Sequence, residues 1–408
     1  MLKRSSPSGP STDDYRHLAA FLPTLISFRD NKNSKGDNQE EGQHIPVLTG
    51  TSRIGASEGV LPYIPCVISP FDDLTVITTC FRERLAKHDF LRIFFLGDSK
   101  IRNLFYEFLH RSDNEYHYMV KLPNGTLPFA ELRRSPAKVH FDMVAMTRAA
   151  PRLLVTFRFK KFSETVPSKF KKSSELRQLR KWAEGDETPP HLLVIGYTPW
   201  MMQGMQNHYP HDLLADLMEV HRLVVPLLQQ VSQKTRVLVL PQSRYRKHAY
   251  SGLRAAMMIA DSDAVNDWSE MMFLHYLQLN AYKSRPPEAR TAASAVPVTG
   301  ASPREKAAAP GNGRRAGQPS RRDRLVPVGG SPGPWWWDTS LPLNVAAISE
   351  CEELYRRNLT HHPVYRGRYL QCEDGQHAGQ STLGDLVTML LNLICNSVLQ
   401  ADPVFCCH

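Results

Sequence analysis

Five short apolar segments lie between residues 92 and 241, and segments of helical periodicity alternate with several of them; this pattern restricts the fold more than any other feature. The strand candidates are residues 92–97, 138–143, 152–159, 191–196 and 236–241, and the helical patterns cover 100–110, 211–231 and 265–282. Strands that are separated by helices favour βαβ units, which build a parallel sheet with helices on both faces. We therefore predict an α/β fold whose functional side chains lie beyond the carboxyl ends of the strands.

Composition divides the 408-residue chain into parts that can and cannot form a core. Residues 1–55 are polar and rich in turn formers, and residues 284–335 are rich in Pro, Gly, Ala and basic residues. Neither segment has enough large apolar side chains to offset the entropy of ordering its backbone. We expect a disordered leader at 1–55, a single domain built from 56–283 and 336–408, and a disordered insertion at 284–335. The alternative to a disordered insertion is that residues 284–335 are non-coding sequence that was translated by mistake.

The net charge of +10 is concentrated in one place. Residues 283–324 contain ten basic and three acidic residues, which leaves +3 for the rest of the chain. No helix-turn-helix, zinc-finger or RNA-binding motif accompanies these charges, so we expect no nucleic-acid partner. A second basic stretch, residues 158–181, has nine basic and two acidic residues. It fits either a solvated surface or a surface that attracts an anionic substrate.

The seven cysteines show no CxxC motif and no metal-ligand spacing with histidine, so we expect no metal site. Their odd number leaves at least one thiol unpaired or intermolecular. Asn124 and Asn358 begin glycosylation sequons, which matter only if the chain enters the secretory pathway. The apolar N-terminal stretch 17–28 is interrupted by Pro23, and no run reaches the 18 or more residues of a membrane span. We therefore expect neither a signal peptide nor a transmembrane segment, and a packed amphipathic helix at 383–399.

Gly97-Asp98-Ser99 stands between a predicted strand and a predicted helix. A serine at this junction projects from the sheet edge beside the free N–H groups of a helix N-terminus, which can stabilise an oxyanion. Two interpretations stay open at this point: Ser99 is a nucleophile, or it caps the helix.

A nucleophilic serine needs a base and a carboxylate that orients the base. The spacing Asp-x-x-His occurs twice, at Asp14 and His17 in the leader and at Asp374 and His377 near the C-terminus. The second pair precedes a helical pattern in which Thr382 is a candidate cap and five apolar residues form an anchoring stripe, namely Leu383, Leu386, Val387, Leu390 and Leu391. Context therefore favours Asp374 and His377 as the partners of Ser99.

These features together resemble the luminal catalytic domain of the sialic acid O-acetyltransferases (N-acetylneuraminate 9-O-acetyltransferase). Those enzymes are relatives of the PC-esterase branch of the SGNH hydrolases. The likeness spans about residues 60–407 and rests on the following motifs: Cys66 and Cys80, Gly97-Asp98-Ser99 with Ile101-Arg102, Asp374-Gly-x-His377, and Cys406-Cys407. It implies a three-layer α/β/α sandwich of the SGNH-hydrolase type with a parallel sheet.

The resemblance also implies roles for single residues. Ser99 would accept the acetyl group, His377 would act as the base, and Asp374 would orient His377. Gly196, through its N–H, and Asn207, through its side chain, would complete an oxyanion hole. Cys66 and Cys80 would form a disulfide, the alternative being two buried thiols.

A carbohydrate O-acetyltransferase of this kind needs no bound cofactor, takes acetyl-CoA as the donor and sialic acid or CMP-sialic acid as the acceptor, and resides in the Golgi lumen. The same residues would serve a carbohydrate O-acetylesterase, and a non-catalytic relative is a third alternative. Two positions depart from the family pattern, Lys100 in place of arginine and Gln376 in place of an apolar residue. The family continues into a membrane domain of several spans after the cysteine pair, whereas this chain ends at His408.

Overall fold

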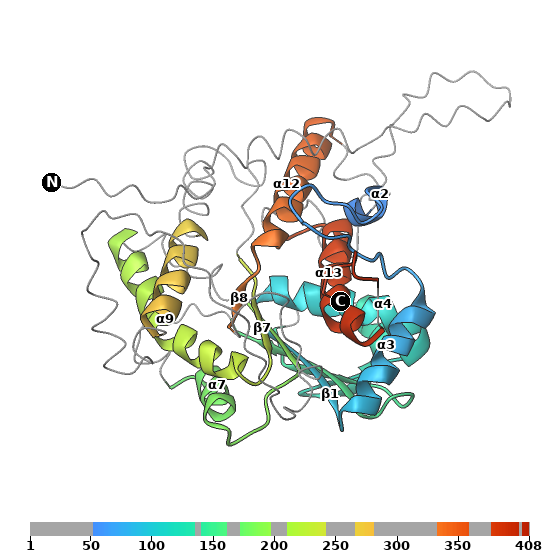
Figure 1. Ribbon diagram of the computed structural model, residues 1–408, viewed down its shortest axis with the longest axis horizontal. Helices are drawn as coiled ribbons and strands as arrows, with labels where there is room; N and C mark the ends of the chain where they lie inside the picture. The colour runs from blue at the N-terminus through green and yellow to red at the C-terminus, as the bar shows by residue number, and fades with distance from the viewer. Residues whose placement is uncertain are drawn as a thin grey trace, which may run out of the picture.

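A computed structural model of the chain describes residues 52–134, 140–160, 172–196, 210–241, 266–280, 333–358, 377–399 and 402–407. In this part of the chain a mostly parallel, eight-stranded sheet lies between two sets of helices (Figure 1). The mixed α/β class predicted from the sequence is therefore correct.

The sheet has the strand order β3-β2-β4-β5-β1-β6-β7-β8. Its strands are β1 Leu91–Gly97, β2 Met119–Leu122, β3 Gly125–Pro128, β4 Met143–Met146, β5 Leu153–Phe159, β6 Leu192–Ile195, β7 Arg236–Val239 and β8 Trp335–Trp336. The pairs from β5 to β8 are parallel, whereas β4, β2 and β3 add to β5 as antiparallel neighbours. The expectation of a wholly parallel sheet is thus corrected at this edge, because the short β2–β3 hairpin needs no crossover helix.

Four of the five predicted strands are confirmed, with ends that differ by one or two residues. The strand expected at 138–143 is wrong, because β4 begins only at Met143. Met143 and Ala145 are fully buried, while Phe141 is 47% exposed. Asp142, the residue before β4, accepts a hydrogen bond from the backbone N–H of Phe159 at 3.0 Å. The segment that pairs in the sheet is the one whose alternate side chains are buried, and a run of apolar residues in the sequence does not identify it alone.

The three predicted helices are also present, and further helices complete the layers. The helices are α2 Arg53–Ala56, α3 Leu74–Lys87, α4 Ser99–Tyr116, α5 Phe129–Arg134, α7 Ser174–Glu184, α9 Pro210–Ser232, the 3-10 turn η5 Asp338–Ser340, α12 Leu341–Arg356, α13 Gln380–Leu399 and a helix at 266–280. Helices α3, α4 and α13 cover one face of the sheet and α7 and α9 the other (Figure 1).

Alternation along β1 explains the two cores. Ile93 and Phe95 pack into the core beneath α3, α4 and α13, whereas Phe94 and Leu96 pack into the core beneath α7 and α9. Successive side chains of a strand point to opposite faces, so an almost continuous apolar strand must be covered on both sides. The result is a three-layer arrangement with the sheet in the middle.

Two predicted boundaries need correction. The expected leader 1–55 overlaps residues 52–55, where Ser52 caps α2 and the Ser52 hydroxyl donates to the carboxylate of Asp385 at 2.5 Å. The expected insertion 284–335 overlaps residues 333–335, where Trp335 pairs with Leu238 in the sheet. Long-range contacts order both ends although their local composition is that of a loop. The rest of both segments lies outside the described residues.

The expected disulfide between Cys66 and Cys80 is wrong. Cys66 is bonded to Cys406, and Cys80 is bonded to Cys395. Cys80 faces inward from α3, where α13 packs beside it, and both Cys80 and Cys395 are fully buried. The backbone of Val67 bonds to Val404 and Cys406, which brings the tail next to Cys66. Packing of the C-terminal segment therefore decides both pairings.

Helix α13 is the one described helix that is long and apolar enough to cross a membrane. Its most apolar window is 78% buried inside the protein, and core helices of soluble proteins have the same length and composition. The predicted stripe of Leu383, Leu386, Val387, Leu390 and Leu391 is buried against the sheet and its neighbours. Thr382 is not the cap that the sequence indicated, because α13 already begins at Gln380.

One buried histidine makes the stability depend on pH. His221 of α9 is 0% exposed, and burial lowers its pKa from 6.5 to about 4. Between these two values the unfolded chain binds the proton and the folded chain does not, so the free energy of unfolding falls as the pH is lowered from 6.5 towards 4. We expect this histidine to contribute a loss of up to about 3 kcal/mol.

Urea denaturation of the parent and of His221→Gln between pH 4 and 7 measures this contribution. The variant should lose less stability than the parent over this interval. His191, whose pKa burial and the nearby His88 also lower to about 4, retains its own share in both proteins. Parallel curves for parent and variant would contradict a neutral, buried His221.

Candidate active site

The turn between β1 and α4 places Ser99 at the carboxyl end of a central strand. Asp98 is the N-cap of α4, and its carboxylate accepts the backbone N–H of Lys100 at 2.9 Å. Ser99 is the first residue of the helix, so its hydroxyl does not serve as the cap. Of the two interpretations of this serine, capping is therefore wrong, and the side chain is left for another contact.

Asp98 is also an electrostatic neighbour of the site. It is 3% exposed, and burial raises the pKa of its carboxyl above the ordinary value. The charges of Lys100 and His377 oppose this shift. A buried carboxyl group thus precedes Ser99 in the chain and lies within electrostatic range of His377.

Two glycines allow the ends of β1 and β6 to approach the first turn of α4. A Cβ atom on Gly97 would lie 2.5 Å from Cγ1 of Ile101 and 2.6 Å from the carbonyl oxygen of Gly196. A Cβ atom on Gly196 would lie 3.0 Å from the same isoleucine side chain. A side chain does not fit at Gly97, which requires glycine for the close approach, whereas at Gly196 the Ile101 side chain would have to shift by a few tenths of an ångström.

His377 meets Ser99 across 278 positions of the sequence. Its Nε2 lies 2.8 Å from Oγ of Ser99, and its side chain is only 8% exposed. Both properties are those of a nucleophile and its general base. The sequence paired these two residues by motif, and the structure brings them into hydrogen-bond contact.

Packing of α13 against α4 positions His377, which precedes α13 by three residues. Arg111 of α4 donates to the Thr388 hydroxyl at 2.7 Å and lies 3.5 Å from the Gly384 carbonyl oxygen. Arg84 of α3 donates to the Ile394 carbonyl at 2.6 Å and to the Ser397 hydroxyl at 2.7 Å near the other end of α13. These side chains hold α13 near both of its ends, and with it His377.

The other predicted site residues do not all join this arrangement. Asp374 and Asn207 lie outside the described residues. The N–H of Gly196 donates to the Leu96 carbonyl at 3.0 Å, as a continuation of the β1–β6 ladder, so its predicted place in an oxyanion hole is corrected. Gly196 acts here by lacking a side chain. Among the described residues, the backbone N–H of Ser99 is bonded to no acceptor and lies beside the Ser99 hydroxyl.

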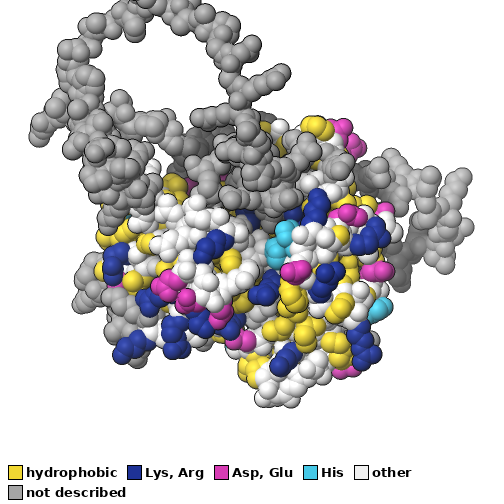
Figure 2. Space-filling view, turned by 60° about the horizontal axis from the view of Figure 1, so that its bottom comes forward, with side chains coloured by type: hydrophobic (Ala, Val, Ile, Leu, Met, Phe, Trp, Pro, Cys, Tyr) yellow, Lys and Arg dark blue, Asp and Glu magenta, His cyan; other side chains and the backbone are white. Residues whose placement is uncertain are grey.

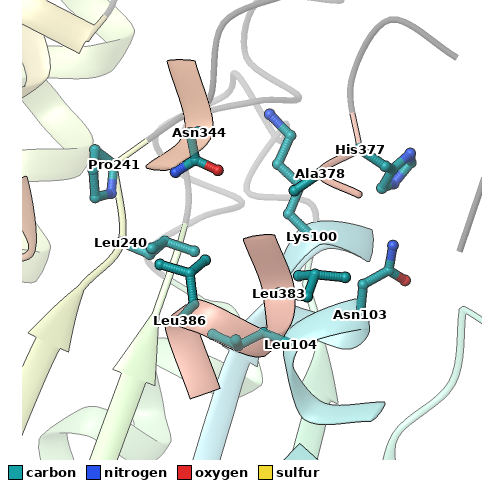
Figure 3. Close-up of a pocket in the computed structure, with 10 residues that line it drawn as sticks. All are labelled: Lys100, Asn103, Leu104, Leu240, Pro241, Asn344, His377, Ala378, Leu383 and Leu386. Atoms are coloured by element: carbon teal, nitrogen blue, oxygen red, sulfur yellow. The ribbon is translucent and has the colours of Figure 1, made fainter. Parts of the chain in front are cut away.

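A small, partly open pocket adjoins the histidine. Polar lining comes from Lys100, Asn103, Asn344 and His377, and apolar lining from Leu104, Leu240, Pro241, Ala378, Leu383 and Leu386 (Figure 3). Sequence reasoning missed Asn103 as a pocket residue. Its signal was its spacing, because residues four apart in a helix share one face and Asn103 follows Ser99 by four.

The described ends of the basic stretch 158–181 are paired with acids. Lys160 lies 3.3 Å from Glu175 in a mostly buried pair, and Lys181 lies 2.6 Å from Glu187 in an exposed pair. Figure 2 shows Lys and Arg interspersed with Asp and Glu on the face in view. These pairs favour an ion-paired surface at the described ends, and residues 161–171 lie outside the described part.

Among the described residues, no group of three or more His, Cys, Asp or Glu is placed to hold a metal ion. Comparison of the chain with protein-family models, with curated proteins and with solved structures finds no match. The interpretation of the site therefore rests on its own geometry.

Proposed function

We propose that the chain is an acyltransferase that carries an acetyl group on Ser99 and passes it to a hydroxyl of sialic acid. The observation that supports this proposal most directly is the 2.8 Å contact between Nε2 of His377 and Oγ of Ser99. The contact lies at the carboxyl end of β1, where open α/β sheets carry their sites. The fold that accompanies the proposal is that of the SGNH hydrolases and their PC-esterase branch.

The first half of the reaction forms the acyl-enzyme. With Nε2 of His377 unprotonated, the Ser99 hydroxyl donates to it, and the proton moves to Nε2 as Oγ bonds to the carbonyl carbon of the donor. The carbonyl electron pair moves to the oxygen and returns when the thiolate of the donor, acetyl-CoA, leaves. His377 gives its proton to that thiolate. Asp374, as the resemblance implies, orients the imidazole and stabilises its charged form.

The second half transfers the acetyl group. A sialic acid hydroxyl gives its proton to Nε2 of His377 and attacks the ester carbon, and Ser99 leaves with that proton. Water in place of the sugar would yield acetate, so the same two residues serve transfer and hydrolysis. Which outcome dominates depends on how well the acceptor excludes water.

A secretory lumen is the proposed location. Two disulfides join distant parts of the chain, and disulfides persist in oxidising compartments. Asn124, which begins a sequon, is exposed in the turn between β2 and β3. Both features support a Golgi-type environment in which the donor and acceptor would meet the chain.

Mass spectrometry of CMP-sialic acid incubated with acetyl-CoA and the purified chain tests the proposal. We expect an acetylated sugar with the parent protein and none with Ser99→Ala. Acetate release from acetylated sugars by the parent alone would make the protein an esterase. If neither acetylated sugar nor acetate forms, and Ser99 does not react with a fluorophosphonate, the result would indicate a non-catalytic relative.

A further inference from the structure

The side-chain amide of Asn103 has a defined orientation. Nη2 of Arg102 lies 3.2 Å from Oδ1 of Asn103, and both side chains are buried. A guanidinium group can only donate, so the amide oxygen must face Arg102 and the amide nitrogen must face the opposite way. The Arg102 guanidinium is itself held near the ring of Tyr106, with 6.0 Å between Cζ and the ring centroid.

The amide nitrogen of Asn103 is a donor on the pocket side, because the amide oxygen accepts from Arg102 and Asn103 lines the pocket. The side chain is only 4% exposed, yet it lines the pocket together with His377. Figure 3 shows Asn103 next to His377, with its nitrogen directed towards the histidine. From the pocket lining, this nitrogen can donate a hydrogen bond to a ligand or to water.

Asn103 also lies on the same face of α4 as Ser99. Residues four apart in a helix have Cβ atoms about 5–6 Å apart, so the amide of Asn103 is close enough to reach an oxygen on a carbon that is bonded to Oγ. The Gly196 N–H donates to Leu96 and is therefore not available to an oxyanion. The N–H of Ser99 and the amide of Asn103 are donors of the described part of the site that remain beside Ser99.

We propose that Asn103 donates a hydrogen bond to the oxyanion that forms when Ser99 attacks an acyl carbonyl. The inference rests on the proposed function, since it needs an acyl group on Ser99. As the Oγ–carbon bond forms, the carbonyl electron pair moves to the oxygen, and Nδ2 of Asn103 and the backbone N–H of Ser99 stabilise the negative charge. The pair returns when the leaving group departs. Arg102 is a positioning residue, because it acts by fixing the orientation of the amide.

The experiment compares Asn103→Ala and Asn103→Asp with the parent in the hydrolysis of p-nitrophenyl acetate and in inhibition by phenylboronic acid, which adds to a serine as a tetrahedral anion. Asn103→Ala should lower kcat by about 10²-fold and leave KM within about threefold, since one oxyanion donor stabilises the transition state rather than the substrate. The inhibition constant of the boronic acid should rise in parallel, because the adduct resembles the transition state.

Asn103→Asp separates a donor role from a structural one. The carboxylate has the shape of the amide and keeps the contact with Arg102, but it repels an oxyanion, so this variant should be at least as inactive as Asn103→Ala. Asn114→Asp, which adds the same charge at an exposed position of α4, is the control and should retain parental activity.

Near-parental activity of Asn103→Asp beside an impaired Asn103→Ala would overturn the proposal and assign Asn103 a structural role through Arg102. Changes of less than threefold in kcat for both variants would overturn it as well. A parent protein that neither turns over p-nitrophenyl acetate nor reacts with a fluorophosphonate at Ser99 would instead contradict the proposed function, and the oxyanion role would fall with it.

Discussion

Ser99→Ala is expected to remove acyl transfer and to leave the fold intact. The loss should be at least about 10³-fold in kcat, because no other group can form the ester that links the two half-reactions. Stability should change little, since the cap of α4 is the Asp98 carboxylate and not the Ser99 hydroxyl. The measurement is turnover of acetyl-CoA with CMP-sialic acid, beside thermal unfolding of the same samples.

Ser174→Ala is a closely matched control. Ser174 is the first residue of α7 and follows the N-cap Ser173, as Ser99 is the first residue of α4 and follows the N-cap Asp98. Removing the Ser174 hydroxyl should therefore leave activity unchanged. If Ser174→Ala and Ser99→Ala lowered activity equally, a general effect at helix starts would replace the nucleophile role.

His377→Ala should be as inactive as Ser99→Ala, and the variant with both substitutions should be no worse than either. Residues that act as one unit show such non-additivity, because removal of one partner already disables the other. Effects that multiplied in the double variant would mean that the two side chains act independently in spite of their 2.8 Å contact.

Loss of the disulfides is expected to have the second largest effect. The bridges connect positions that are 340 and 315 residues apart, and both attach the C-terminal segment to the residues around α3. While one disulfide remains, the second disulfide closes an additional loop of only roughly 25 residues. Removing a single disulfide should therefore lower the free energy of unfolding by about 3 kcal/mol. Removing both should cost more than twice as much, because the second loss frees a loop of over 300 residues.

Enzymatic activity should fall once the second disulfide bridge is also removed. His377 is held by α13, and the Cys80–Cys395 bridge joins α13 to α3. Once both bridges are reduced, packing alone keeps the base beside Ser99, so hydrolysis of p-nitrophenyl acetate should decline at temperatures where the oxidised protein is fully active. Cys407→Ala, which removes an exposed free thiol, is the control and should change neither stability nor activity.

Urea denaturation of Cys80→Ala/Cys395→Ala, with and without a reducing agent, measures the two costs separately. Peptide mapping under non-reducing conditions identifies the pairs directly. A peptide that links Cys66 to Cys80 would contradict the packing of the C-terminal segment described above, and equal stability of the oxidised and reduced proteins would contradict the energetic estimate.

Local patterns in the sequence determined the elements near the site. The apolar run 92–97 and the helical spacing after it predicted β1 and α4, because side-chain periodicity is a property of neighbouring residues. The same reasoning placed Ser99 at a strand end and put His377 ahead of an anchored helix. These inferences required only residues within one or two turns of each other.

Tertiary structure alone decided which distant groups meet. Packing between segments that are far apart in the chain decides three features. They are the antiparallel edge of the sheet, the disulfides Cys66–Cys406 and Cys80–Cys395, and the hydrogen bond from the Gly196 N–H to the Leu96 carbonyl. A sequence shows which residues can bond, but the choice among partners follows from how helices and strands bury their apolar faces. For that reason the contact between Ser99 and His377 could be predicted from motifs, while the disulfide pairs and the place of Asn103 in the pocket lining could not.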